Sequence, residues 1–285
     1  MKEPTDTPTS GDVNIVIDES YTLLFDTEIH TFQSLYVNAK VHAKYLPEDS
    51  ALLALMSDSA KVAVINRPLK DEERKSFETK NIFPIETKIA EDAIAFVVNT
   101  ENPDTNIQFE QIARIMAGID TTWKQINERS VFGGIQVIFD NPNSANARYI
   151  ANFSKEAHLP KNAYAVKSNS EVIEYVNKNK NAIGVVSVNW ISDKDDSTTI
   201  GFLKKIKVLG ISKAGNTEKY YKPYQAYIKT KDYPFCRDVY MINRQTRAGL
   251  GMGFVSFVAG EKGQRIILKM GLVPSIAPTR MVEIH

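Results

Sequence analysis

Short apolar runs that alternate with helical segments are the feature that most limits how this chain can fold. VNIVI (13–17) and KVAVINRPL (61–69) have the length of buried strands and end in polar turns. Residues 21–36 follow the first run with apolar side chains at helical spacing, and the charged segment 71–80 follows the second. Strands that alternate with helices are typical of a layered α/β sheet.

The same pattern returns in the second half of the chain. GGIQVIF (133–139) and NAIGVVSVNWI (181–191) read as strands, the latter with a close-packing glycine. YQAYIKT (224–230) is predicted as a later strand, GLGMGF (249–254) as a turn, and residues 254–271 as one closing helix. Because 285 residues exceed what a single core usually covers, we expect two α/β lobes.

The charge balance and the single cysteine exclude several classes of protein. The chain has 35 basic and 34 acidic residues and no long basic block, which argues against nucleic acid as a partner. Cys236 has no cysteine to pair with and is predicted to be a structural thiol. Residues 1–12 are rich in Pro, Thr and Ser and are predicted to be a disordered tether. Such a polar leader fits a cytoplasmic protein or a secreted one whose signal segment has been removed.

Polar turns follow three of the predicted strands, where ligands gather in parallel α/β sheets. They are residues 18–22, 66–68, and 141–146 with Arg148. Two of these turns open helices, whose free N–H groups attract anions, and arginine matches a tetrahedral oxyanion in a bidentate way. The alternative stays open: Ser20 and Ser144 would then be plain helix caps, and the arginines solvated.

Signals for an enzyme are weak in the sequence. The histidines, at positions 30, 42, 158 and 285, lack metal-ligand spacing, and there is no P-loop or GxSxG motif. We therefore expect no catalytic residue, no metal and no cofactor. The aromatic stretch KYYKPYQAY (219–227) permits a membrane or carbohydrate surface, but a core strand is the plainer interpretation.

Several segments in this order resemble one known family. They include IAFVVNTENP, QFEQIARIMAG followed by TTW, VIFDNPNSANARYI, NAIGVVS, and the closing FVSFVAGEKGQRIILKMGLVP. The chain resembles, from about residue 13 onward, the periplasmic phosphate-binding proteins of ABC transporters, the PstS-like branch of the type II solute-binding fold. The resemblance implies two α/β lobes, each a central β-sheet flanked by helices, with a hinge of two crossing strands. It also implies an anion held between the lobes by helix N-termini.

The resemblance also implies which residues bind the anion. Those at matching positions are Ser20, Tyr21, Ser50, Arg67, Ser144, Asn146 and Arg148. Ser144-Ala145-Asn146 stands where the family usually has Ser-Gly-Thr, and alanine restricts the backbone of that turn. Arg67 stands where the best-known members place an aspartate, an acceptor that would favour a protonated oxyanion. Sulfate therefore stays open beside phosphate.

These observations combine into one leading hypothesis. The chain is expected to be a monomeric, non-catalytic solute-binding protein that captures inorganic phosphate or a similar oxyanion and delivers it to an ABC transporter permease. Lobe one would comprise residues 13–97 and 223–285, and lobe two residues 98–222. The expected location is the periplasm or cell envelope, with a lipid anchor. The alternative is the same fold used as a cell-surface binding or sensor module for another anion or an organic ligand.

Overall fold

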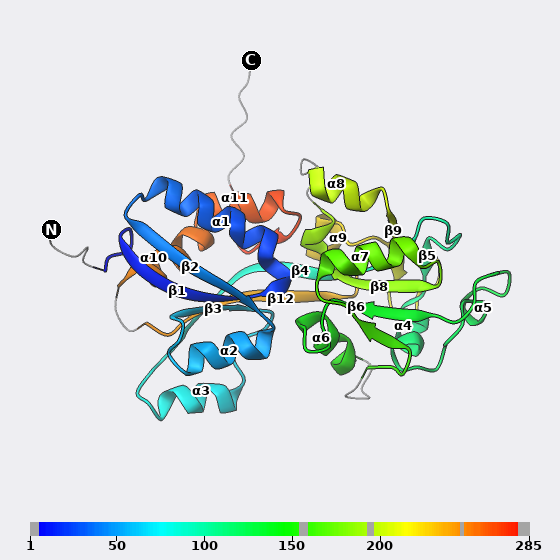
Figure 1. The fold of residues 1–285 in the computed structure, drawn as a ribbon, viewed down its shortest axis with the longest axis horizontal. Coiled ribbons are helices and arrows are strands. Elements are labelled where there is room, and N and C mark those ends of the chain that lie inside the picture. Colours follow the sequence, from blue (N-terminus) through cyan, green and yellow to red (C-terminus); the bar gives the residue numbers. More distant parts are fainter. Residues whose placement is uncertain (1–5, 154–158, 193–196, 246–247, 279–285) are drawn as a thin grey trace, which may run out of the picture. The chain divides into compact units, whose positions relative to one another are not determined.

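The computed structural model describes residues 6–153, 159–192, 197–245 and 248–278. The chain divides into two compact units, which we describe separately (Figure 1). Unit 1 comprises Met1–Glu91 and Asp238–His285, and unit 2 comprises Asp92–Arg237. The division falls inside two strands, β4 (Ile85–Asn99) and β12 (Cys236–Asn243), that continue from one unit into the other. The division expected from the sequence, at 97/98 and 222/223, differs by several residues, because nothing in a continuous apolar strand marks where it leaves one sheet.

The sheet of unit 1 has the order β2-β1-β3-β12-β4, and a short strand pairs with β4 on the far side. Its remaining strands are β1 (Gly11–Asp18), β2 (Ala39–Leu46), β3 (Val62–Ile65) and β13 (Val273–Pro274). β1 lies parallel to both β2 and β3, whereas β12 is antiparallel to β3. The carboxyl ends of β1, β2 and β3 therefore meet at one edge, which brings together the turns that follow them.

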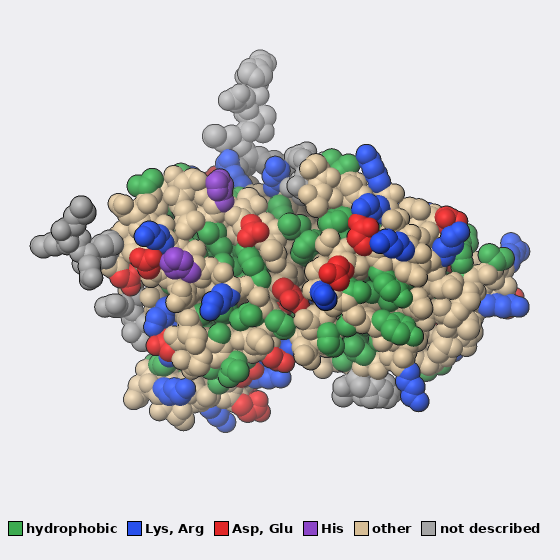
Figure 2. Space-filling view, viewed as in Figure 1, with side chains coloured by type: hydrophobic (Ala, Val, Ile, Leu, Met, Phe, Trp, Pro, Cys, Tyr) green, Lys and Arg blue, Asp and Glu red, His purple; other side chains and the backbone are tan. Residues whose placement is uncertain are grey.

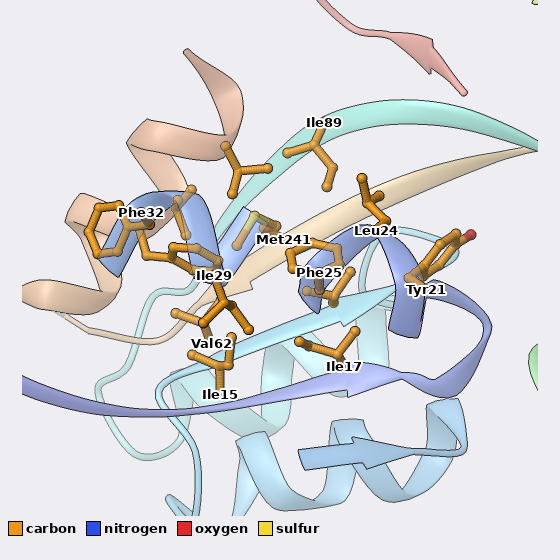
Figure 3. Close-up of a cluster of buried hydrophobic side chains, with 14 of the residues drawn as sticks. Ile15, Ile17, Tyr21, Leu24, Phe25, Ile29, Phe32, Val62, Ile89 and Met241 are labelled. Atoms are coloured by element: carbon orange, nitrogen blue, oxygen red, sulfur yellow. The ribbon is translucent and has the colours of Figure 1, made fainter. Parts of the chain in front are cut away.

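Helices cover both faces of this sheet (Figure 1). They are α1 (Thr22–Leu35), α2 (Glu48–Met56), α3 (Asp71–Glu78), α10 (Leu250–Ala259) and α11 (Glu261–Lys269). Ile15 and Ile17 point into a core formed with α1, α10 and α11, part of which Figure 3 shows. Val16, between them, points to the opposite face and packs in the core formed with α2 and α3. This alternation is what a strand buried on both faces requires.

In unit 2 the central sheet has the order β4-β8-β6-β7, and β9 also pairs with β4. The strands besides β4 are β6 (Gln136–Phe139), β7 (Ala163–Ala165), β8 (Ala182–Ser187) and β9 (Ile206–Val208). A second sheet has the order β11-β10-β5, from β5 (Asn106–Ile107), β10 (Gly210–Ser212) and β11 (Tyr220–Tyr221). The α-helices are α4 (Phe109–Met116), α5 (Trp123–Ile126), α6 (Ala145–Phe153), α7 (Asn169–Lys178), α8 (Ser197–Leu203) and α9 (Gln225–Lys229).

Two glycines in unit 2 have distinct structural roles, and the sequence predicts that of Gly184. A Cβ at Gly184, in β8, would lie 2.8 Å from methyl groups of Val172 and Val176, so this glycine lets α7 pack closely on the strand. Gly118 follows the last turn of α4 with φ of +71°, a left-handed conformation that favours glycine after a helix C-terminus.

Three predictions of secondary structure are wrong. Residues 224–230 form helix α9 rather than a strand, with Ile228 as its one buried residue. GLGMGF belongs to α10 except for Gly249, because packing rather than propensity decides this helix. Gly260 is extended and separates α10 from α11, so the predicted single closing helix is two.

The N-terminal segment also differs from the predicted tether. Residues 1–5 lie outside the described part of the chain, whereas Gly11 and Asp12 belong to β1 and residues 6–10 are structured. The side chain of Asp6 accepts a hydrogen bond from the backbone N–H of Leu250 at 2.8 Å and so caps α10. Thr7 and Ser10 form a tight backbone bridge beside it.

Surface charge is mixed in both units. On the face that Figure 2 shows, the described basic and acidic side chains are interspersed over each unit. Among the described residues, no helix is long and apolar enough to cross a membrane.

Candidate functional site

Polar side chains gather in each unit at the ends of strands. We call those of unit 2 the unit 2 cluster, which comprises Asp92, Asp140, Ser144, Asn146, Asn169, Ser187 and Arg237. Those of unit 1 form the unit 1 cluster, which comprises Asp18, Ser20, Tyr21, Glu48, Asn66 and Arg67. All except Asn66 and Arg67 are buried.

Asp140 organises the turn that follows β6. Its Oδ1 accepts a hydrogen bond from the Ser144 hydroxyl at 2.6 Å. Its Oδ2 accepts from the side-chain amides of Asn146 at 3.1 Å and Asn169 at 2.9 Å. One carboxylate therefore fixes three neutral polar groups, two from the turn and α6 and one from the start of α7.

Ser144 is the N-cap of α6, and the single proton of its hydroxyl is already donated within the protein. The oxygen accepts from the N–H of Ala147 at 3.1 Å while its proton goes to Asp140. The N–H groups of Ala145 and Asn146, the first two of α6, have no hydrogen-bond partner within the described part of the chain. The donors that remain for an anion at this turn are thus backbone groups at a helix N-terminus, where the helix dipole adds positive potential.

Asn146 contributes a further polar atom to the turn. The residue is fully buried, and its Nδ2 contacts Asp140 and Asn169. Its Oδ1 is buried and, among the described residues, finds no hydrogen-bond partner. A buried acceptor without a partner is costly, so a ligand that carries a proton would satisfy it.

An arginine that the sequence analysis misses lies in the same cluster. Arg237, in β12, is 6% exposed and forms an ion pair with the fully buried Asp92 of β4, with Nη2 2.8 Å from Oδ2. The Ser187 hydroxyl donates to the same oxygen at 2.8 Å. The backbone N–H of Ser187 lies 3.4 Å from Asn169 Oδ1, so the ion pair connects to Asp140 through a chain of hydrogen bonds.

Burial and charge act in opposite directions on Asp140. Burial raises the pKa of its carboxyl above the usual value, while the Ser144 hydrogen bond and the positive charge of Arg237 lower it in part. Arg237 is therefore close enough to influence the turn electrostatically. Because Arg237 is paired with Asp92, its guanidinium contributes positive potential near Asp140 without adding a net charge to the pair.

Arg148, which the sequence predicts for the site, lies one turn into α6. It is half-buried, and its Nη2 is 3.4 Å from the carbonyl oxygen of Asn143 in the preceding turn. The structure thus places Arg148 beside the turn.

In unit 1, the turn after β1 has another cap than Ser20. Glu19–Tyr21 forms a short 3-10 helix before α1, and Asp18 caps it by accepting from the N–H of Ser20 at 2.9 Å. Ser20 is fully buried inside this turn and makes no side-chain cap of α1, whose N-cap is Tyr21. The alternative interpretation of Ser20 as a plain cap of the following helix does not hold, because Ser20 lies inside the 3-10 helix that Asp18 caps.

Tyr21, Glu48 and Asn66 connect the three turns of unit 1. The Tyr21 hydroxyl donates to Oδ1 of Asn66, which follows β3. The carboxylate of Glu48, at the start of α2, accepts from the backbone N–H of Asn66 at 3.4 Å and from its Nδ2 at 3.3 Å. Glu48 is 3% exposed and is a member that the sequence analysis misses.

Arg67 is held by carboxylates of its own unit. Its Nε donates to Glu48 at 3.0 Å, and Nη1 and Nη2 form a bidentate pair with Glu73 at 2.8 and 2.9 Å. Nη1 also donates to the Pro68 carbonyl at 3.0 Å. Burial alone would lower the pKa of Arg67, but these carboxylates raise it above its ordinary value. Four of its N–H groups are thus engaged, which leaves one of the five of a guanidinium.

Ser50 and His42 make no described contact with either cluster. Ser50 is in the first turn of α2 and is exposed, and no described hydrogen bond connects its side chain to the cluster. His42 lies 3.0 Å from Asp12 on the surface, and His158 and His285 are outside the described residues. The described part of the chain contains no group of three or more metal-ligating side chains.

Comparison with known proteins gives a consistent result. The sequence model of one family, described as PBP superfamily domain, matches residues 2–262. Phosphate-binding protein PstS of Staphylococcus saprophyticus is 27% identical over 216 residues, 73% of this chain and 63% of that protein. The protein of the same name in Staphylococcus aureus is 26% identical over 234 residues, 80% of this chain and 67% of that one.

One solved structure shows the same fold over nearly the whole chain. It is that of a phosphate ABC transporter substrate-binding protein of Clostridium perfringens with bound phosphate. The TM-score is 0.77 at 20% identity, with 93% of this chain and 100% of that chain covered. The alignments with the two staphylococcal relatives span about two thirds of the length of each.

Proposed function

Because the chain belongs to the PBP superfamily domain family, we propose that it is a solute-binding protein that captures inorganic phosphate and delivers it to the permease of an ABC transporter. The names of the two staphylococcal relatives and the ligand of the Clostridium perfringens protein support phosphate as the solute. The proposed role is binding without catalysis, as those names describe it.

The observation that carries this proposal is the start of α6. Two backbone N–H groups, of Ala145 and Asn146, are left for a ligand, and the turn before them is fixed by the buried Asp140. Arg237 brings a positive charge to the same cluster. Preorganised N–H donors beside a buried guanidinium suit a dehydrated oxyanion, because neither needs to rearrange when the ligand replaces water.

The acceptor in the unit 2 cluster favours phosphate over sulfate. At neutral pH, phosphate retains at least one proton, whereas sulfate retains none. A phosphate hydroxyl can donate to the buried Oδ1 of Asn146, which otherwise has no partner among the described residues. Sulfate would leave that acceptor unsatisfied, and sites with buried polar groups discriminate strongly against ligands that fail to pair them.

The seven residues predicted from the sequence enter this proposal with different roles. Ser144 shapes the turn through Asp140, and Asn146 supplies a backbone donor and the acceptor. Arg148, Ser50, Ser20 and Tyr21 are proposed as further contributors from helix N-termini and turns. Arg67 is proposed to act with its one remaining N–H group, since Glu48 and Glu73 neutralise most of its charge.

The cellular setting follows from the same proposal. A protein that hands its ligand to a permease acts on the outer side of the membrane, in the periplasm or cell envelope. We propose that it works there as a monomer and that a lipid anchor holds it at the membrane.

Thermal unfolding of ligand-stripped protein tests the proposed ligand. A ligand that binds only the native state at 100 times its Kd adds about 2.7 kcal/mol to the free energy of unfolding. For units of this size that corresponds to a rise in Tm of roughly 5–10 °C. We expect this rise with phosphate and arsenate and none with sulfate at equal ionic strength. An equal rise with sulfate would contradict the role of Asn146, and no rise with any anion would contradict the function.

A further inference from the structure

Unit 2 contains a cavity of about 290 Å³ whose lining includes no member of the unit 2 cluster. Its walls come from the segment after β8, the end of α8, β9 and the residues that precede α9. Five aliphatic side chains form most of the apolar surface: Val188, Ile191, Leu203, Ile206 and Val208. Three of them, Val188, Ile191 and Ile206, are themselves at most 6% exposed, so the floor belongs to the packed interior of the unit.

Two lysines line this cavity, and they differ in whether their ammonium groups form hydrogen bonds. The Nζ of Lys207 donates to the carbonyl oxygen of Asn102 at 2.7 Å and is held there. Lys222 is half-buried, and within the described part of the chain no hydrogen bond or ion pair engages its ammonium. Tyr224, which is 56% exposed, lies beside it in the lining. The cavity therefore combines an apolar floor and a phenol with two lysines, of which Lys222 has no partner for its ammonium among the described residues.

We propose that this cavity binds a monocarboxylate with a short aliphatic chain, with the carboxylate on Lys222 and Tyr224 and the chain on the aliphatic floor. Lys222 can pair with one carboxylate, whereas Lys207 is held on the Asn102 carbonyl, and the aliphatic floor offers no partner to a second carboxylate. Since a water molecule occupies about 30 Å³, the cavity holds roughly ten non-hydrogen atoms. Octanoate has that size. The proposal also gives a role to the KYYKPYQAY stretch, which phosphate binding leaves unexplained.

Chain length is the most direct test. Binding of butanoate, hexanoate, octanoate and decanoate is measured by isothermal titration calorimetry on the full chain. Each buried methylene is expected to improve the affinity about fourfold until the cavity is full, and decanoate to bind no better than octanoate. Octanoate should shift the methyl NMR signals of Ile191 and Ile206, and leave those of Ile15 and Ile17 in unit 1 unchanged.

Two variants and a control locate the site. Lys222→Met keeps the aliphatic stem and should weaken octanoate binding about tenfold while leaving octanol binding unchanged. Leu203→Trp fills the cavity and should abolish binding of both. Lys204→Met, at an exposed lysine outside the cavity, should bind octanoate like the wild type.

The proposal is overturned by three results. They are no binding of any chain length, no dependence on chain length, and octanoate binding that Lys222→Met leaves intact. If instead only a protein partner protects these methyl groups, the cavity is a docking surface and the carboxylate assignment is wrong. Phosphate affinity should be the same in Lys222→Met and the wild type, so failure here and failure of the proposed phosphate function are separate results.

Discussion

The hydroxyl of Ser144 donates a 2.6 Å hydrogen bond to Oδ1 of Asp140, and both residues are fully buried. The same hydroxyl accepts from the N–H of Ala147, so serine here connects the end of β6 to the first turn of α6. A residue with the signature of a ligand donor therefore acts mainly as a scaffold. The backbone N–H groups that it positions are the donors left for an anion.

Replacing Asp140 tests this arrangement. Asp140→Asn exchanges one acceptor oxygen for a donor that faces other donors, so Ser144 or Asn146 loses its partner. Hydrogen bonds to charged groups are worth about 1.5–3 kcal/mol, and we expect phosphate affinity to fall about 10- to 100-fold in calorimetry. Asn143→Ala, on an exposed residue of the same turn, is the matched control and should bind like the wild type. Unchanged binding by a folded Asp140→Asn would contradict the scaffold role.

The buried ion pair of unit 2 makes a second prediction. Arg237→Met leaves Asp92 as an uncompensated buried charge, which we expect to cost about 3–5 kcal/mol of the free energy of unfolding. Lys180→Met, which removes an exposed pair with Glu101, should change stability by less than about 1 kcal/mol. Urea unfolding of both variants measures the contrast.

A compensating variant separates charge from packing at this pair. Arg237→Met combined with Asp92→Leu removes both charges and should regain part of the lost stability, because no ion then stays buried alone. It should not regain phosphate affinity, because the proposed site still lacks its guanidinium. A double variant less stable than Arg237→Met alone would show that the pair contributes through packing.

From the buried carboxyl of Glu28 we expect the free energy of unfolding of unit 1 to depend on pH. Glu28 is fully buried on α1, both its oxygens lack hydrogen-bond partners among the described residues, and burial raises its pKa from 4.5 to about 9. Between pH 4.5 and about 9, the carboxyl of Glu28 therefore keeps its proton in the native state and has lost it in the unfolded chain. The contribution of Glu28 to the free energy of unfolding falls by about 1.4 kcal/mol per pH unit as pH rises through that window.

Glu28→Gln removes this slope, because the amide is neutral at every pH. The variant should match the wild type near pH 4.5 and gain on it progressively up to about pH 9, in urea unfolding measured at several pH values. Glu78→Gln, an exposed glutamate on α3, is the control and should follow the wild-type profile. A constant difference between Glu28→Gln and wild type across pH 5 to 8 would mean that the carboxyl ionises normally.

The position of Gly253 leads to a prediction about how the N-terminal segment packs against α10. A Cβ at this position of α10 would overlap the backbone carbonyl of Pro8. Gly253→Ala should therefore displace residues 6–10, remove the Asp6 cap on Leu250 and lower stability by about 1 kcal/mol or more. Hydrogen exchange at the Leu250 amide should rise with it.

Gly201 in α8 provides the contrast for that prediction. A Cβ there meets no atom of the described residues within 4 Å, so Gly201→Ala should gain up to about 1 kcal/mol from helix propensity alone. Gly253→Ala that behaves like Gly201→Ala would show that the segment does not pack against α10.

The sequence predicts the fold well where the signal is local. Strand and helix patterns locate β1, β3 and β6, and the close-packing role of Gly184 follows from a glycine inside an apolar strand. The strand predicted at residues 224–230 is wrong. Its alternating tyrosines resemble a strand pattern, whereas the segment folds as a short helix in which only Ile228 is buried. The turn predicted at residues 249–254 is wrong for a similar reason, because Gly253 makes room for Pro8 of the N-terminal segment inside a helix and does not mark a turn.

The site is harder to predict because its partners are distant in sequence. Arg237 is 145 residues from Asp92, and no local pattern connects two charges in different strands. Arg67 stands out in the sequence, yet Glu48 and Glu73 already engage it, which only the folded chain reveals. The turn at 140–146 could be located, because a polar run after a buried strand is a local signal. Which of its groups hold the turn in place and which remain as donors for a ligand could not be predicted.

Calorimetric titration of ligand-stripped protein with phosphate tests the central claim most directly. The account predicts saturable binding of one phosphate per chain, clearly weakened in Asp140→Asn and unchanged in Asn143→Ala. A titration without heat of binding from phosphate, arsenate or sulfate, on protein shown to be folded, would contradict it.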